Sequence, residues 1–224
     1  METNWNTTGR NVDPSEFSRE IEQPDLVTLI RNFLHDRLGP TEDYLPNSSH
    51  PGPPHFNSPI SVYPSALATF RAPSDMYGTG NMCRERIRAV PSWRQGPARH
   101  DCVFVESNGG KGMRGLNVAR VRLFFSFTFR GQSYPCALVH KYYRVGNDPD
   151  EVTGMWIVKA EKDVHGAPSA AVLHLDTVIR AAHLIGIYRT DTVPTGLTAE
   201  QSLDAFSAFY VNKFIDHHSF AIAF

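Results

Sequence analysis

The chain has 224 residues, of which 41% are hydrophobic and 11% aromatic, enough for one well-packed domain and too few for two large ones. Its formal charge of −1 excludes a globally basic nucleic-acid-binding protein. Three cysteines without C-x-x-C spacing argue against both a disulfide framework and a thiolate zinc site, and no apolar run reaches the length of a membrane helix. We therefore expect a soluble intracellular protein, nuclear or cytoplasmic, with no membrane partner.

The first part of the chain divides into an arm, a helix and a linker. Residues 1–24 are polar and without sustained periodicity, which predicts a disordered arm. Residues 25–59 contain an amphipathic helix, capped by Asp25 and ended by Gly39-Pro40, followed by a proline-rich linker. Because the apolar stripe of this helix must cover something, it packs either on the rest of the domain or on a protein partner. The stripe consists of Leu26, Ile30, Phe33 and Leu34.

A long hairpin is predicted at the centre of residues 60–224. Apolar residues occupy every odd position from Ala119 to Phe129, the two-residue period of a strand with one buried face, and only Phe124 breaks the pattern. The residues Arg130-Gly131-Gln132-Ser133 predict the reversal, and a second β-rich run follows. Further strand candidates lie at 60–70, 101–106, 153–161 and 171–188. The fold class expected is mainly β (α+β), a small curled β-barrel.

The last segment of the chain predicts a packing helix. Thr198 and Gln201 have capping-box spacing, and the apolar residues after them follow a helical period up to Phe214. We expect a C-terminal helix of roughly 18 residues across the barrel.

The most informative functional pattern is a basic segment. Nine basic residues stand against three acidic ones between Arg84 and Arg122, a local net charge of +6. Guanidinium groups bind phosphate and an aromatic ring can stack on a base, so this composition favours nucleic-acid binding. The alternative is a half-polar β-surface whose arginines pair with acids elsewhere in the chain. The candidate nucleic-acid-binding residues are Arg84, Arg86, Arg88, Trp93, Arg94, Arg99, Arg120 and Arg122.

Catalytic and metal chemistry find little support in the sequence. Adjacent histidines such as His217-His218 point about 100° apart on a helix and cannot easily chelate one ion. Cys102 and Cys136 lie in apolar strand contexts outside any nucleophile motif. We expect no catalytic residue, no metal and no cofactor. A cage for a methylated ammonium ion remains as an alternative, with four candidate aromatics: Trp93, Tyr142, Tyr143 and Trp156.

Several stretches carry a family resemblance. They are A-T-F-R-A-P-S-D-M-Y-G-T-G-N-M-C-R-E-R-I-R-A-V-P-S-W-R from Ala68, A-R-V-R-L-F-F-S-F from Ala119, H-L-D-T-V-I-R-A-A-H-L-I-G-I-Y from His174 and F-Y-V-N-K-F-I-D-H-H from Phe209. From Val62 onward the chain resembles the C-terminal region of Plavaka-type DNA transposon proteins of mushroom-forming fungi.

The resemblance implies a transposon-derived protein without the RNase H-like catalytic domain that precedes this region in the family. No catalytic residue is carried over to this chain. The order of strands, the H-L-D-T-V-I-R motif and a closing helix are also similar to a BAH domain, which implies a chromatin ligand. An assembly module that contacts a transposase or itself through the Leu26, Ile30, Phe33 and Leu34 stripe is the second hypothesis.

Overall fold

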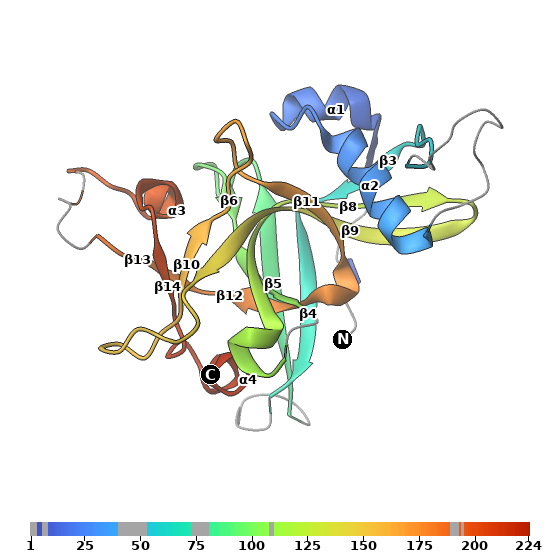
Figure 1. The fold of residues 1–224 in the computed structure, drawn as a ribbon. Coiled ribbons are helices and arrows are strands. Elements are labelled where there is room, and N and C mark those ends of the chain that lie inside the picture. Colours follow the sequence, from blue (N-terminus) through green and yellow to red (C-terminus); the bar gives the residue numbers. More distant parts are fainter. Residues whose placement is uncertain are drawn as a thin grey trace.

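The computed structural model describes residues 4–5, 9–39, 53–72, 81–107, 110–188, 193 and 195–224. The chain is mainly β, and one strongly curled sheet occupies its centre (Figure 1). The strands are β1 (Asn4–Trp5), β2 (Arg10–Val12), β3 (Ile60–Tyr63), β4 (Ser65–Arg71), β5 (Met82–Val90), β6 (Arg99–His100), β7 (Cys102–Glu106), β8 (Leu116–Phe129), β9 (Gln132–Val145), β10 (Ile157–Ala160), β11 (Ala170–His174), β12 (Val178–Ala182), β13 (Leu184–Gly186) and β14 (Phe209–Val211). The helices are α1 (Pro14–Glu20), α2 (Leu26–Leu38), α3 (Ser202–Ala205) and α4 (His217–Ala223), with short 3₁₀ turns η1 (Gly112–Gly115), η2 (Leu175–Thr177) and η3 (Ala199–Gln201).

The β8–β9 hairpin organises the larger sheet. This sheet has the order β12-β7-β8-β9-β10-β14-β13, and β3 and β11 pair with further stretches of β8 and β9. A smaller sheet, β1-β4-β5-β6, lies beside it, and the strands of both sheets pair antiparallel. Small and branched side chains of β4 and β5 pack against the interior of the curled sheet: Ala66, Ala68, Ile87 and Ala89. The two sheets therefore share one core.

A β-bulge in β8 accounts for the one break in the predicted alternation. Val121 pairs with Val139 and Leu123 with Leu138, so Arg122 is an extra residue in this strand. Before the bulge, Val121 faces the core shared with β4 and β5; after it, Phe124 faces that core. The prediction of one buried face with odd parity is therefore wrong over this strand, because both faces are covered and the parity changes at Arg122.

The hairpin turn is shorter than the four residues predicted for it. Phe129 pairs with Gln132, and the two residues between them, Arg130 and Gly131, have φ angles of 50° and 77°. Positive φ at both central residues is the type I′ geometry whose twist matches that of paired strands. Gly131 adopts it without steric cost.

Helix α2 occupies the segment for which the sequence predicts a helix, but its stripe is covered by the protein itself. Leu26, Ile30 and Leu34 have no exposed surface, and they join the apolar cluster of β8, β9 and β11. The Phe33 ring meets the Phe127 ring edge-on, with 6.3 Å between centroids. The proposal that this stripe is a free surface for a protein partner is therefore wrong. Asp25 stands at the N-cap position, but its side chain makes no capping hydrogen bond.

The N-terminal arm is partly ordered, contrary to the prediction for residues 1–24. β2 pairs with β3, and α1 begins at Pro14 after Asp13, whose carboxylate accepts hydrogen bonds from the Ser15 and Glu16 N–H groups at 2.8 and 3.1 Å. Phe17 is 7% exposed and joins the cluster under α2. One buried aromatic side chain and the N-cap of α1 order a segment whose composition is polar.

Of the predicted linker, residues 40–52 lie outside the described residues, and Phe56 is buried against Phe127.

The predicted C-terminal helix is wrong in extent. The Thr198–Gln201 capping box is present but starts only η3 and α3, after which Phe209–Val211 form β14 between β10 and β13. Phe209 and Val211 are almost fully buried while Tyr210 is half-buried, which is strand alternation. The pairing of β14 with two neighbouring strands overrides a spacing of apolar residues that would also suit a helix.

In the described part of the chain no helix is both long and apolar enough to cross a membrane.

Candidate nucleic-acid interface

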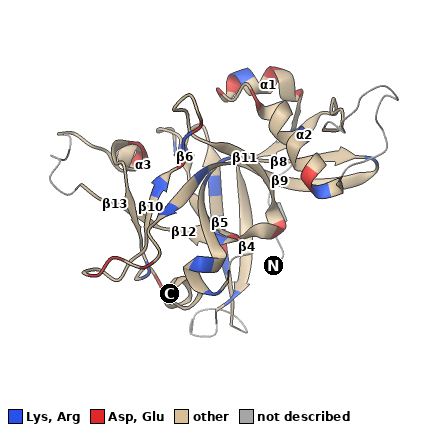
Figure 2. Ribbon diagram, viewed as in Figure 1, with Lys and Arg blue, Asp and Glu red and all other residues tan. Residues whose placement is uncertain are grey.

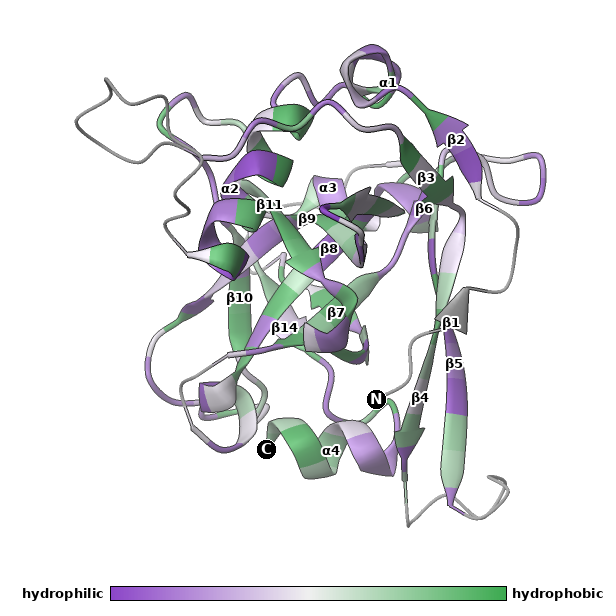
Figure 3. Cartoon of the chain, turned by 90° about the vertical axis from the view of Figure 1, so that its right-hand side faces the viewer, coloured by the Kyte–Doolittle hydropathy of each residue, from purple (hydrophilic) through white to green (hydrophobic). Residues whose placement is uncertain are grey.

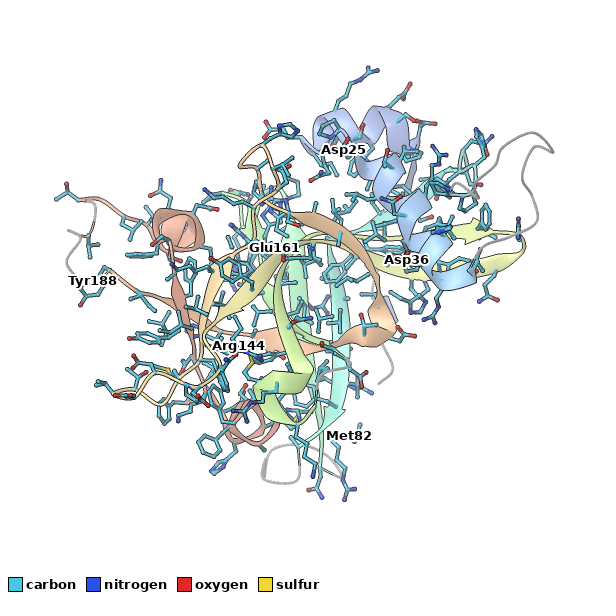
Figure 4. The ribbon with its side chains drawn as sticks, viewed as in Figure 1. Asp25, Asp36, Met82, Arg144, Glu161 and Tyr188 are labelled. Carbon is cyan, nitrogen blue, oxygen red and sulfur yellow. The ribbon has the colours of Figure 1, made fainter. Side chains whose placement is uncertain are left out.

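Strand β5 presents its arginines on one face because it alternates strictly. Ile87 and Ala89 point into the core, so Arg84, Arg86 and Arg88 point outward. Figure 3 shows β4 and β5 side by side at one edge of the molecule, with hydrophilic segments along β5. Arg86 donates to the Ser65 hydroxyl at 3.1 Å, and Arg84 is exposed and forms no ion pair with the described residues. Basic residues are frequent along this strand (Figure 2), and Figure 4 labels Met82, where β5 begins.

Trp93, in the turn between β5 and β6, is in contact with three guanidinium groups. The guanidinium carbons of Arg88, Arg94 and Arg99 lie 4.5, 5.5 and 5.6 Å from the centre of its ring. Cation–π contacts of this kind stabilise an arginine cluster against its own repulsion. The protein's own guanidinium groups cover the Trp93 ring. A nucleic-acid base therefore cannot stack on this ring without displacing them, contrary to the prediction from the sequence.

The turn holds Arg94 in place at a conformational cost. Arg94 and the following Gln95 have φ angles of 52° and 63°, in the left-handed region that favours glycine. Two backbone hydrogen bonds close the turn. The Trp93 N–H donates to the Pro97 carbonyl at 3.0 Å, and the Gly96 N–H donates to the Trp93 carbonyl at 2.9 Å. Non-glycine residues in this region carry strain that clusters at functional sites.

Asp101 is the main counter-charge in this group. Its carboxylate accepts from the Arg99 Nε at 2.8 Å and from the Arg88 backbone N–H at 2.9 Å. Burial, followed by the nearby charge of Arg99, lowers the pKa of Arg88. The arginines thus stand in a positive field that one carboxylate offsets only in part. We call this surface the β5–β6 arginine face, which consists of Arg84, Arg86, Arg88, Trp93, Arg94 and Arg99.

The structure separates Arg120 and Arg122 from that face. Arg120 is 8% exposed, and its guanidinium donates to both carboxylate oxygens of Asp204 at 2.6 and 3.2 Å. Burial alone would lower the pKa of Arg120, but the hydrogen bonds to Asp204 raise it. Arg122 is half-buried, with its Nη1 3.5 Å from the Nδ1 of His100. Neither arginine extends the exposed surface as the sequence suggested.

The methyl-ammonium cage does not form from the four predicted aromatics. Tyr142 and Trp156 are 6% and 4% exposed and belong to the core beside β14. Arg144, labelled in Figure 4, lies over the Trp156 ring at 5.0 Å and donates to the Met113 carbonyl at 2.7 Å. Tyr142 and Trp156 are therefore packing residues, whereas Tyr143 is 47% exposed and Trp93 is covered by arginines, so this alternative is not retained.

The buried cysteines and the possible metal ligands do not form a reactive site among the described residues. Burial raises the pKa of the Cys102 thiol to about 12 and also raises that of Cys136, so neither is a ready thiolate. Within the described ranges, no three His, Cys, Asp or Glu side chains gather as metal ligands would.

Sequence reasoning missed two partners of the buried arginines. Asp204 pairs with Arg120, which is 84 residues away in the sequence, and Asp216 pairs with Arg180, which is 36 residues away. Local sequence patterns do not predict ion pairs between residues so far apart in the chain.

No protein-family model matches the chain, and no curated protein is significantly similar to it.

Proposed function

We propose that this chain is a non-catalytic, transposon-derived interaction module that binds nucleic acid or chromatin through the β5–β6 arginine face. The observation that carries the proposal is the gathering of three arginines, Arg88, Arg94 and Arg99, around one half-buried tryptophan, with Asp101 as the main counter-charge. Arginine presents a planar fork that matches phosphate oxygens. A preformed arginine cluster on a nearly neutral protein favours a polyanion at this one face.

The curled sheet and the sequence resemblances support a chromatin context for this binding. A Plavaka-type origin and a BAH-like barrel both suit a module that works beside DNA. The assembly alternative loses its proposed surface, because α2 is packed on its own sheet.

The most specific test removes two exposed arginines that form no ion pair with the described residues, Arg84 and Arg94. Replacing Arg84→Gln and Arg94→Gln together should weaken binding to a short DNA duplex and lower the slope of log affinity against log salt by about two. The reason is that each lost guanidinium releases about one fewer counterion. Fluorescence anisotropy across a salt series measures both quantities.

A matched control carries the same charge change elsewhere. Arg19 on α1 and Lys162 in the β10–β11 connection are both exposed, and Arg19→Gln with Lys162→Gln removes two positive charges. The control should bind DNA as the unmodified protein does. Equal losses in the two double variants would mean that net charge, and not the β5–β6 arginine face, determines the affinity.

A further inference from the structure

A second group of basic side chains lies half-buried between β6, β8 and β9. It consists of Arg120, Arg122, His100 and His140, which we call the Arg120 cluster. Arg120 stands opposite His140 in the β8–β9 register, and Arg122 is the bulge residue of β8. A bulge redirects a side chain, and here Arg122 contacts His100. Residues from three strands thus bring four basic groups together.

The cluster carries more positive charge than the protein neutralises there. Asp204 is the carboxylate in contact with it, and the Asp204 side chain is 67% exposed on the four-residue helix α3. Burial, then the charges of Arg122 and Arg120, lowers the pKa of both His100 and His140 to about 4. Asp204 acts on both histidines in the opposite direction, and Glu22 does so on Arg122. The histidines are therefore neutral at pH 7, and the two guanidinium groups face one carboxylate.

Several hydrogen-bond donors of this cluster are not used by the described residues. An arginine can only donate, so the Nδ1 of His100 accepts from Arg122 and its Nε2 carries the proton. Arg120 Nε is buried and has no hydrogen-bond partner within the described part of the chain. An unmet donor on a buried guanidinium costs free energy until an acceptor reaches it.

A cavity of about 320 Å³ opens beside these donors, between β6, β8 and the η3–α3 segment. Its wall combines positive and apolar groups, with Asp101 already engaged by Arg99 and with Glu200 exposed at the α3 side. The basic and apolar side chains in this wall include Trp93, Arg99, His100, Arg120 and Leu203.

We infer that this cavity binds the phosphate group of a small phosphate monoester, with Arg120, His100 and Arg99 as donors and Arg122 as the supporting charge. A phosphate offers three terminal oxygens, one more than the carboxylate of Asp204, and guanidinium groups bind it in the same bidentate way. Asp204 occupies Arg120 when the cavity is free of ligand and competes with the phosphate. Leu203, together with the part of the Trp93 side chain that lines the cavity, supplies apolar surface for the organic part of the ligand. This site goes beyond the proposed DNA-binding function, and it overlaps the β5–β6 arginine face at Arg99 and Trp93.

Calorimetric titration of the full chain with inorganic phosphate, AMP and adenosine tests the inference. We expect saturable 1:1 binding of AMP and of phosphate, and none of adenosine. Asp204→Asn should tighten AMP binding roughly tenfold because it frees the Arg120 Nη groups, whereas Arg122→Gln should weaken it about as much. Failure of both phosphate-containing ligands, equal binding of adenosine, or weaker binding by Asp204→Asn would overturn the proposal.

Two further measurements keep the test independent of variant stability and of the DNA-binding proposal. In the unmodified protein, saturating phosphate should raise the pKa of His100 and His140 as followed by NMR, because an anion offsets the two arginines; unchanged histidines would refute the site. Arg84→Gln, whose side chain does not line the cavity, should bind AMP normally even though it weakens DNA binding. Comparing an oligonucleotide with and without a 5′-phosphate then identifies the source: tighter binding of the phosphorylated strand indicates a nucleic-acid end, and equal binding a free monoester.

Discussion

Arg180 is the most deeply buried charged side chain among the described residues, with 4% exposure. It donates to both oxygens of Asp216 at 2.8 and 2.7 Å, and its guanidinium lies 4.7 Å from the Phe70 ring centre. Asp216 also accepts the Ser219 N–H at 2.8 Å as the N-cap of α4. One carboxylate thus fixes the C-terminal helix to β12 and compensates a buried charge.

Replacing Asp216→Asn should lower the free energy of unfolding by about 2 kcal/mol, less than for a fully buried pair because Asp216 is partly exposed. Urea unfolding measures this loss. The control Asp36→Asn, on the exposed side of α2 (Figure 4), should change stability by less than about 0.5 kcal/mol. If both variants unfold at the same urea concentration, Asp216 does not hold α4 as described.

The two histidines of the Arg120 cluster predict a pH dependence of stability. Their folded pKa of about 4 lies below the ordinary value of 6.5, so the unfolded chain binds more protons between these values. Stability should therefore fall as the pH falls from about 6.5 to about 4, and level off below that for these two groups. Thermal unfolding across this range checks the prediction. In the double variant His100→Gln and His140→Gln the slope should be smaller; an unchanged slope would assign the effect to other groups.

At the scale of elements, the sequence predicted the period of the strands better than their faces. The apolar repeat identified the β8–β9 hairpin and the segment of α2, since both follow a single local period. It could not reveal the bulge at Arg122, which depends on the pairing of β8 with β9. Likewise, the Phe206 to Phe214 spacing fits a helix or a strand, and only the neighbours β10 and β13 decide for β14.

The bulge leads to a deletion test. Removing Arg122 should leave a regular strand in which Val121 and Phe124 still face the same core, so the variant should fold cooperatively. Removing Ser126 instead should move Phe127 out of the cluster under α2 and prevent folding. Circular dichroism with urea unfolding compares the two. A folded Ser126 deletion, or an unfolded Arg122 deletion, would contradict the account of β8.

At the scale of the whole molecule, the arginines illustrate what a sequence can and cannot place. The sequence analysis identified the basic segment by its composition, but β5 was not among its strand candidates, so the shared face of Arg84, Arg86 and Arg88 comes from the structure. Closeness in sequence brings Arg94 and Arg99 to the same turn. The burial of Arg120 and its pairing with Asp204 join distant segments, which only the folded chain reveals. The candidate surface is therefore smaller than the sequence suggested, and the half-buried Arg120 cluster was not predicted.

The most direct test of the proposed function is the affinity of the unmodified chain for short duplex and single-stranded DNA, measured by fluorescence anisotropy from low to physiological salt. The account predicts binding that is micromolar or tighter at low salt, falls steeply as salt rises, and is weakened by Arg84→Gln with Arg94→Gln. Absence of binding at low salt, or binding that does not change with salt, would contradict the assignment of the β5–β6 arginine face to nucleic acid.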